Sequence, residues 1–241
     1  MVFEKLKSIN PGLDIRGADD PAFARYARVL DAAPYHTLMD LLDRLVRPNA
    51  ESNHYVASVP ALEADASYER LRLMYGCTDT QVGYCCGPNS LLNAMEWHES
   101  PEINMAVTDM VLFLGRRSDI APDGTYGSDK AECFYLPQGT AVELLPETLH
   151  YSPCKVYASG FTCVVVLPRE TNQEFSRAER DAIREESLLP DASPGRKNLK
   201  LRMLMMKDKW LIAHAEAEDL VSSGAFIGVV GKNYRLNFLA D

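Results

Sequence analysis

Apolar residues recur at helical spacing in the first third of the chain. Asp20 followed by Pro21 is a helix start signal, because aspartate caps the free amides of a first turn and proline fits its first position. We expect helices over residues 21–33, 35–47 and 60–73, a short strand over residues 55–59, and an irregular or extended lead-in over residues 1–20. Residues 1–75 are therefore expected to form a helical and extended segment that packs on the remainder of the molecule.

From Gly76 the pattern changes to short apolar or alternating runs of strand length. Glycine, proline, asparagine or aspartate separates most of these runs, and no long helical stripe interrupts residues 76–168. Such spacing is typical of an all-β sandwich or barrel and argues against a parallel sheet with crossover helices. The expected strands cover residues 81–84, 91–98, 103–115, 131–136, 140–145, 150–157 and 161–167. We predict a mainly β protein in which residues 76–241 form a barrel.

The last part of the chain alternates polar segments with apolar runs. Ser176 and Glu179 form a capping-box signal for a helix over residues 176–186. After it we expect a loop over residues 191–198, a hairpin of residues 201–206 and 210–213, a short helix over residues 215–223, and a closing strand pair of residues 226–230 and 234–239. The end of the chain is thus predicted to add strands to the barrel.

Composition and charge narrow the class of protein. The 241 residues are 46% hydrophobic and 24% charged, as in an ordinary soluble globular protein, and the net charge is −9. An acidic surface argues against a nucleic-acid or anionic-membrane partner. The chain has no apolar run of about 18 residues that predicts a membrane span, and its first residues lack the apolar core of a signal peptide. The six cysteines include no CxxC pair, so we expect reduced thiols and a cytoplasmic location.

Two short polar clusters interrupt the apolar runs between residues 91 and 151. Glu96 and His98 stand two positions apart in an expected strand, so their side chains point to the same face. Glu102 follows across a Ser-Pro turn, and His150 lies on another expected strand. Two imidazoles and two carboxylates suit Mn²⁺, Fe²⁺, Co²⁺, Ni²⁺ or Zn²⁺ better than Ca²⁺. The set predicts a site for one divalent transition metal, with positions left for substrate or water.

Each of these residues also has a structural interpretation. A histidine in a strand is more often a packing residue than a metal ligand, and Glu102 could lie in an exposed turn. Glu96 could orient His98 by a hydrogen bond instead of binding the metal. The sequence leaves these alternatives open.

The two clusters resemble the two motifs of the cupin superfamily. The first cupin motif is a glycine, H-x-H, a glutamate four or five residues on and a second glycine, and its counterparts here are Gly87, Glu96-x-His98, Glu102 and Gly115. The second is P-x-G with a late histidine, and its counterparts are Pro137-Gln138-Gly139 and His150. Glu96 replaces the first histidine, and His150 lies eight residues beyond Val142, where the late histidine usually stands. The resemblance implies a cupin-like double-stranded β-helix barrel with flanking N-terminal helices, one bound metal and a homodimer.

A closer resemblance extends over nearly the full chain. The segments that carry it are residues 83–85, 92–98, 102–104, 114–116, 149–151 and 209–214. They look like a bacterial cupin-like family associated with sugar catabolism and with aldose–ketose isomerisation of sulfoquinovose. Residues 142–153 are also similar to the closing strands of ureidoglycolate lyase, where Glu96-x-His98 has a counterpart. The resemblance implies a cytoplasmic, metal-dependent sugar isomerase with Mn²⁺ as the first candidate cofactor; a lyase and a sugar-binding cupin without turnover are the alternatives.

The isomerase interpretation assigns further roles. The metal would hold the sugar's carbonyl and adjacent hydroxyl and stabilise an enediolate, while a carboxylate moves a proton between the two carbons. Glu143 and Glu132, in expected strands near the second motif, are the catalytic candidates. The candidates for substrate binding are Arg116 and Lys130, as cations for an anionic sugar, and Tyr84 and Asn89, as pocket residues. Each of the six could instead be an exposed or packing residue.

Overall fold

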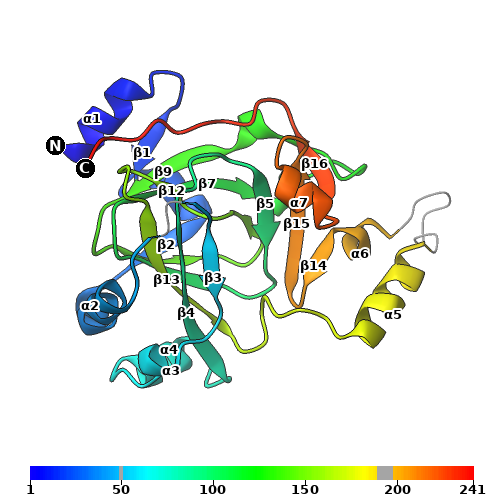
Figure 1. Cartoon of the computed structure of the whole chain (residues 1–241), viewed down its shortest axis with the longest axis horizontal. Coiled ribbons are helices and arrows are strands. Elements are labelled where there is room, and N and C mark those ends of the chain that lie inside the picture. The colour runs from blue at the N-terminus through cyan, green and yellow to red at the C-terminus, as the bar shows by residue number, and fades with distance from the viewer. Residues whose placement is uncertain (49–50, 189–197) are drawn as a thin grey trace.

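The computed structural model of the chain describes residues 1–48, 51–188 and 198–241. It is mainly β, as expected, and its three sheets make up the middle of the molecule (Figure 1). The central sheet contains β1 (Ile15–Gly17), β9 (Glu132–Leu136), β7 (Met110–Arg116) and β11 (Thr148–Leu149), with β12 (Cys154–Lys155) also paired to β7. The helix-covered sheet has the order β2 (Ala27–Leu30), β10 (Ala141–Leu144), β6 (Glu102–Ala106), β13 (Phe161–Pro168), β4 (Thr80–Gly87) and β3 (His54–Val56). The C-terminal sheet has the order β14 (Leu204–Met206), β15 (Lys209–His214), β16 (Phe226–Val230) and β8 (Tyr126–Gly127), and β5 (Ala94–Trp97) pairs with β15.

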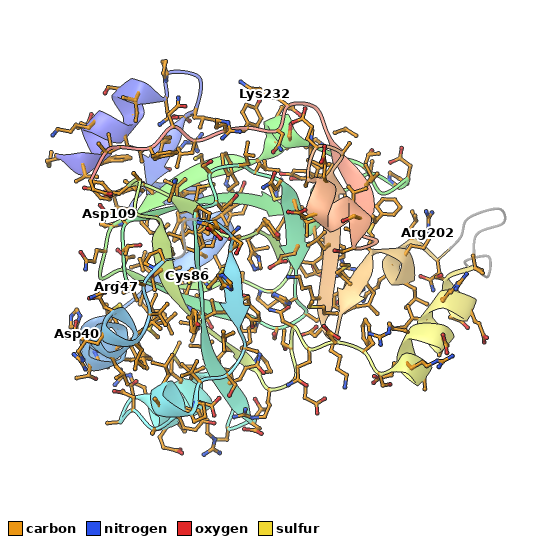
Figure 2. All side chains as sticks on the ribbon, in the orientation of Figure 1. Asp40, Arg47, Cys86, Asp109, Arg202 and Lys232 are labelled. Carbon is orange, nitrogen blue, oxygen red and sulfur yellow. The ribbon has the colours of Figure 1, made fainter. Side chains whose placement is uncertain are left out.

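The hydrophobic core lies on both faces of the central sheet. On β7, Met110, Leu112 and Leu114 pack toward the helix-covered sheet, whereas Val111 and Phe113 pack toward the C-terminal sheet. Successive residues of a strand point to opposite faces, so a strand buried on both faces needs the continuous apolar run found here. Each fully buried leucine contributes about 1.5–3 kcal/mol of transfer free energy. Side chains fill the space between the sheets (Figure 2).

Three helices cover the outer face of the helix-covered sheet. They are α2 (His36–Leu45), α3 (Pro60–Glu63) and α4 (Tyr68–Met74). Leu38 and Leu42 stand four residues apart on α2, and both are buried against this sheet with Leu71 of α4. Asp40 and Arg47 are exposed and lie on the outer side of this layer (Figure 2). Each helix therefore buries an apolar stripe against the outer face of this sheet and leaves its inner face to form a site.

The first 33 residues differ from their prediction in two places. The lead-in contains a helix, α1 (Val2–Ile9), as well as β1. The helix expected over residues 21–33 is wrong: a 3₁₀ helix, η1 (Pro21–Arg25), is followed by strand β2. The start signal itself is confirmed, because Asp20 accepts a hydrogen bond from the Ala22 amide. The helix ends early because β2 pairs antiparallel with β10 from Ala27 to Leu30, so a tertiary pairing overrides the local apolar spacing.

The segment 1–75 also contributes to the sheets. β1 pairs with β9, β2 with β10, and β3 with β4, while the helix expected over residues 60–73 is divided into α3 and α4. β3 places His54 and Tyr55 of this segment in the wall of a cavity. Among the described residues, no helix has the length and hydrophobicity needed to cross a membrane.

The C-terminal elements follow their prediction more closely. The helix expected over residues 176–186 is α5 (Arg177–Leu188), and the expected hairpin is β14 and β15, with α6 (Leu199–Met203) before it. The short helix is α7 (Glu218–Ser222). Residues 234–239 do not form the expected strand; single bridges from Arg235 and Leu239 tie them to the body, and Leu236 is buried. The loop expected over residues 191–198 lies, apart from its last residue, outside the described residues.

Candidate metal centre

Four of the predicted site residues converge inside the barrel. Glu96 lies in β5 and His98 directly follows that strand, while Glu102 begins β6 and His150 directly follows β11. Glu96 and His150 form an antiparallel bridge, with N···O distances of 2.6 Å and 3.0 Å between their backbones. Directly opposed residues in such a pair present their side chains on the same face. This bridge is what brings the second sequence cluster to the first.

The ligand-bearing atoms lie close together and away from water. Oε2 of Glu102 is 3.2 Å from Nε2 of His98 and 3.4 Å from Nε2 of His150. Ligand atoms of Glu96, His98 and His150 all lie within 4.8 Å of one another. The four residues are between 1% and 8% exposed. Two carboxylates and two imidazoles at this depth require a shared cation or strong pairing with one another.

Backbone carbonyls fix the orientation of both imidazoles. Nδ1 of His98 is 2.6 Å from the Asp208 carbonyl oxygen, and Nδ1 of His150 is 2.9 Å from the Thr148 carbonyl oxygen. A carbonyl can only accept, so each Nδ1 carries a hydrogen and donates it. Each Nε2 is then the atom left for a metal, and both Nε2 atoms are buried without a hydrogen bond. The carbonyl of Asp208, rather than Glu96, therefore orients His98.

The separations also fit a metal. Two atoms bound to one ion at about 2.0–2.2 Å, at octahedral or tetrahedral angles, stand about 2.8–3.6 Å apart. The two distances from Glu102 to the imidazoles fall in that range. His98, His150 and Glu102 together offer the two imidazoles and one carboxylate that divalent transition metals favour. The residues present therefore fit the predicted kind of metal.

Charges within the cluster reinforce one another. Burial disfavours the charged form of Glu102, but the neighbouring His150 and His98 outweigh it and lower the pKa of this carboxyl below its usual range. Burial likewise works against a charged His150, but the Glu102 carboxylate outweighs it and raises the pKa of His150. The other oxygen of Glu102, Oε1, accepts a hydrogen bond of 2.6 Å from Asn104. Glu102 is thus held ionised and aimed between the two imidazoles.

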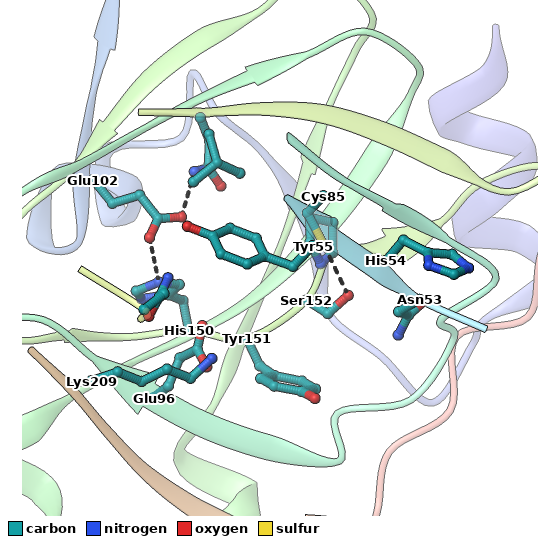
Figure 3. Close-up of a pocket in the computed structure, with 14 residues that line it drawn as sticks. Asn53, His54, Tyr55, Cys85, Glu96, Glu102, His150, Tyr151, Ser152 and Lys209 are labelled. Atoms are coloured by element: carbon teal, nitrogen blue, oxygen red, sulfur yellow. Dashed lines mark hydrogen bonds and ion pairs between the residues drawn. The ribbon is translucent and has the colours of Figure 1, made fainter. Parts of the chain in front are cut away.

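A small cavity of about 180 Å³ opens onto this cluster. It has room for about six water molecules at ~30 Å³ each, or for one small substrate. Figure 3 shows Glu102 pointing toward His150, with Glu96 and Lys209 beside them and the Tyr55 ring across the space. The lining residues are Asn53, His54, Tyr55, Cys85, Glu96, Glu102, Asn104, His150, Tyr151, Ser152, Pro153, Val165, Asn172 and Lys209. Polar groups therefore converge on the candidate ligands from several separate strands and loops.

Two lining residues were absent from the predicted set and bear on its chemistry. Lys209 begins β15, and its Nζ lies 2.5 Å from Oε2 of Glu96. Leu211 is opposite Glu96 in the sheet, and Lys209 lies two residues before Leu211 on the same strand face. Lys209 is therefore the diagonal neighbour of Glu96. Tyr55 comes from β3; burial, with the charges of Glu102 and Glu96, raises the pKa of its hydroxyl and keeps it a donor. In the sequence Tyr55 follows His54 and Lys209 follows Asp208, but neither stands in the two polar clusters, and strand pairing places both in the cavity.

The predicted catalytic glutamates lie elsewhere. Glu143 is buried on the face of the helix-covered sheet opposite Glu102 and forms an ion pair with Arg28. Glu132 interacts with Arg16 at 2.9 Å, with Arg25 and with the Tyr26 hydroxyl. Neither carboxylate is among the residues that line the cavity. The structure thus separates these two glutamates from the cluster, and arginines from the N-terminal segment hold them.

The predicted substrate-binding residues also lie outside the described cavity lining. Arg116 is exposed and pairs with Asp119 at 3.5 Å, and Lys130 donates to the Asp119 carbonyl at 3.2 Å. Tyr84 packs among the helices because it points to the opposite face from its neighbour Cys85. Asn89 donates to the carbonyls of Leu91 and Ser152, so it supports a loop that lines the cavity. Of these residues, Asn89 alone contacts a lining residue through a described hydrogen bond.

Comparisons with solved structures give partial likenesses at low identity. EvdO2 from Micromonospora carbonacea var. aurantiaca, complexed with 2-oxoglutarate, is 13% identical over 63% of this chain and 91% of that chain, with a TM-score of 0.41. A mutant of Bacillus subtilis oxalate decarboxylase OxdC is 12% identical over 63% of this chain and 33% of that chain, with a TM-score of 0.32. A structure from work on the DMSP lyases RdDddP and RnDddQII is 15% identical over 36% of this chain and 37% of that chain, with a TM-score of 0.25. The chain thus spans about a third of the length of the last two proteins.

Sequence comparison assigns the chain to a family. No curated protein matches it. One family matches residues 15–234, which takes in all four residues of the candidate metal centre and the hairpin that carries Lys209. The protein is therefore a member of the family described as a domain of unknown function, DUF4867.

Proposed function

We propose that the protein is a metal-dependent aldose–ketose isomerase that acts on a small sugar. The observation that carries the proposal is the convergence of two buried Nε2 atoms and the Glu102 carboxylate at a small cavity. A lysine and a further carboxylate, Lys209 and Glu96, face the same cavity as an ion pair. A cation site beside the Glu96–Lys209 pair supports proton transfer between two adjacent carbons of a sugar and between their oxygens.

His98, His150 and Glu102 would hold the metal. Mn²⁺ is the first candidate, and Zn²⁺, Co²⁺, Ni²⁺ and Fe²⁺ are compatible with the same ligand types. A divalent cation bound there would act as a Lewis acid that stabilises negative charge on two sugar oxygens. Glu96 was predicted as a fourth ligand, but its contact with Lys209 supports a different role, in proton transfer.

The isomerisation needs two proton transfers and no oxidant or reductant. One proton leaves C2 and is returned to C1, so the C2–H electron pair becomes the C1–C2 double bond of the enediolate and then the new C1–H bond, while the O–H pair at C2 forms the new carbonyl. A second proton moves from the C2 hydroxyl to the C1 oxygen. We assign the carbon-to-carbon transfer to the Glu96 carboxylate and the oxygen-to-oxygen transfer to the Lys209 ammonium, which donates to one oxygen and recovers a proton from the other. The two groups touch, so each stabilises the charge that the other needs.

The volume of the cavity and the charges of its lining residues limit the class of substrate. A cavity of about 180 Å³ suits a molecule no larger than a monosaccharide. The family resemblance supports sulfoquinovose, converted to sulfofructose, as that molecule. The pocket supports an anionic sugar less directly: the described lining residues include Lys209 but no arginine, and Arg116 and Lys130 stand outside the lining.

The test is proton exchange followed by NMR in D₂O. The metal-loaded protein is incubated with glucose, other aldoses and sulfoquinovose, and deuterium at C2 of one sugar is the expected result. The Glu96→Gln variant should keep its metal and lose exchange at least 100-fold, in line with general-base catalysis of about 10²–10⁴-fold. Glu132→Gln, the same change in a distant carboxylate, is the matched control and should exchange normally.

Three results would contradict the proposal. Glyoxylate release from ureidoglycolate without deuterium exchange would favour the lyase alternative. Sugar binding without exchange would favour a binding protein. Loss of metal from Glu96→Gln would make Glu96 a ligand and remove its assigned role as proton carrier.

A further inference from the structure

A two-residue turn outside the cavity supports the candidate ligands from behind. Lys207 and Asp208 connect β14 to β15, where Met206 pairs with Lys209. Asp208 takes a left-handed conformation, with φ of 51°. Glycine, asparagine and aspartate adopt this conformation at the lowest cost, and β-branched residues resist it. The identity of residue 208 therefore controls where its carbonyl points.

That carbonyl reaches the imidazole of His98. The Asp208 carbonyl oxygen is 2.6 Å from Nδ1 of His98, although the two residues are 110 positions apart in the chain. His98 is 1% exposed, so its imidazole is shielded from water. The hydrogen bond fixes the hydrogen on Nδ1 and leaves Nε2 facing Glu102.

The Asp208 side chain anchors the turn to the segment that carries His98. Its Oδ1 accepts from the Glu99 amide at 3.2 Å, and its Oδ2 accepts from the hydroxyls of Ser100 and Thr171, each at 3.4 Å. The side chain thus ties the turn to the two residues that follow His98, while the main chain orients the imidazole itself. Lys209, the next residue, holds Glu96 from the same hairpin.

We propose that Asp208 is a positioning residue for the metal centre. Its left-handed conformation directs its carbonyl at His98 Nδ1, and this selects the tautomer whose Nε2 is free to bind a metal. The inference rests on the metal site of the proposed function. The β14–β15 turn would thus act on the metal centre although Asp208 does not line the cavity.

Three substitutions at one position separate conformation from charge. Asp208→Asn and Asp208→Gly tolerate the left-handed conformation, whereas Asp208→Val does not. The matched control is Cys77→Val, which places valine at another left-handed residue, with φ of 65°, in an exposed turn after α4. The measurements are Mn²⁺ and Zn²⁺ affinity by titration calorimetry and ¹⁵N NMR of the histidine side chains in the metal-free protein at pH 8. Thermal unfolding in EDTA reports on folding.

The expected result is a graded loss of affinity. Asp208→Val should weaken metal binding about 10- to 100-fold, as removal of such outer hydrogen bonds generally does. Its His98 should give signals of both tautomers, whereas wild type and Asp208→Asn should give the Nδ1–H form. Asp208→Gly should fall between them, and Cys77→Val should bind as wild type.

Unchanged affinity and tautomer in Asp208→Val would overturn the proposal. A loss in Asp208→Asn equal to that in Asp208→Val would also overturn it, because charge rather than conformation would then be the cause. If wild type binds no metal, the proposed function fails by itself. The tautomer of His98 in the metal-free variants still decides the role of Asp208 in that case.

Discussion

Replacing Lys209 with methionine should destabilise the metal-free protein far more than the metal-loaded protein. The Lys209 ammonium and the Glu96 carboxylate form an ion pair at 2.5 Å, and the two side chains are 16% and 10% exposed. Methionine keeps most of the length and volume of the lysine stem but has no charge. Glu96 is then left as a buried carboxylate without its cation, which is costly in a low-dielectric interior.

The size of the effect follows from the geometry. Two unit charges 2.5 Å apart attract by about 7 kcal/mol at an effective dielectric constant of about 20. Desolvation of both groups offsets part of this attraction, and removal of one partner of a buried pair costs about 3–5 kcal/mol. For a chain of this length about 1 kcal/mol shifts Tm by about 2–4 °C, so the expected fall in Tm is about 6–20 °C. A metal ion near Glu96 supplies positive charge again and should restore most of the loss.

Denaturant and thermal unfolding in EDTA, with and without added Mn²⁺ or Zn²⁺, measure this difference. The double variant Glu96→Gln with Lys209→Met removes both charges and should be more stable in EDTA than Lys209→Met alone. A fall of less than about 1 kcal/mol in EDTA, the range of exposed ion pairs, would show that the buried Glu96–Lys209 ion pair does not stabilise the metal-free protein as proposed. An equally unstable double variant would do so too, because the loss would then come from packing.

Three further outcomes are expected. His98→Ala and His150→Ala should each lose stoichiometric metal while keeping wild-type far-UV circular dichroism, and retained metal in either variant would remove that histidine from the ligand set. Because Glu102 raises the pKa of His150, the metal-free protein gains stability from this group below about pH 6.5 and loses it as pH rises through the raised pKa. Metal binding needs the neutral imidazole, so the Tm increase on adding metal should be larger at pH 8 than at pH 6, and the reverse order would contradict the assignment. Glu132→Gln should lower the unfolding free energy by about 1–2 kcal/mol, because it weakens a half-exposed cluster with Arg25, and should leave metal affinity unchanged.

The features that the sequence predicts well depend on neighbours along the chain. The apolar run of residues 103–115 predicts strand structure, which the protein forms as two strands, β6 and β7, rather than one, and the two-residue spacing of Glu96 and His98 predicts side chains on one face. Asp20 marks the start of a helical turn that the structure confirms. In each case the physical cause acts between residues that are close in sequence, so the local sequence pattern is enough to predict the feature.

The remaining features depend on strand register, which the local pattern does not contain. His150 meets Glu96 through a single antiparallel bridge, and the side chains of Lys209 and Tyr55 enter the cavity through the pairings of β15 and β3. Register also decides which face a glutamate occupies: Glu143 and Glu102 lie in adjacent strands of one sheet but on opposite faces. Pairing also explains why residues 27–30, expected to be helical, form strand β2: they pair with β10.

We propose that Glu102, His98 and His150 form a site for one divalent transition metal. Its most direct test is elemental analysis of protein purified without chelator, with wild type and His150→Ala prepared side by side. We expect about one transition-metal ion per wild-type chain, as for a single ligand set, and little in the variant. Metal-free wild type that also takes up no Mn²⁺ or Zn²⁺ on titration, or equal metal in the two proteins, would contradict it.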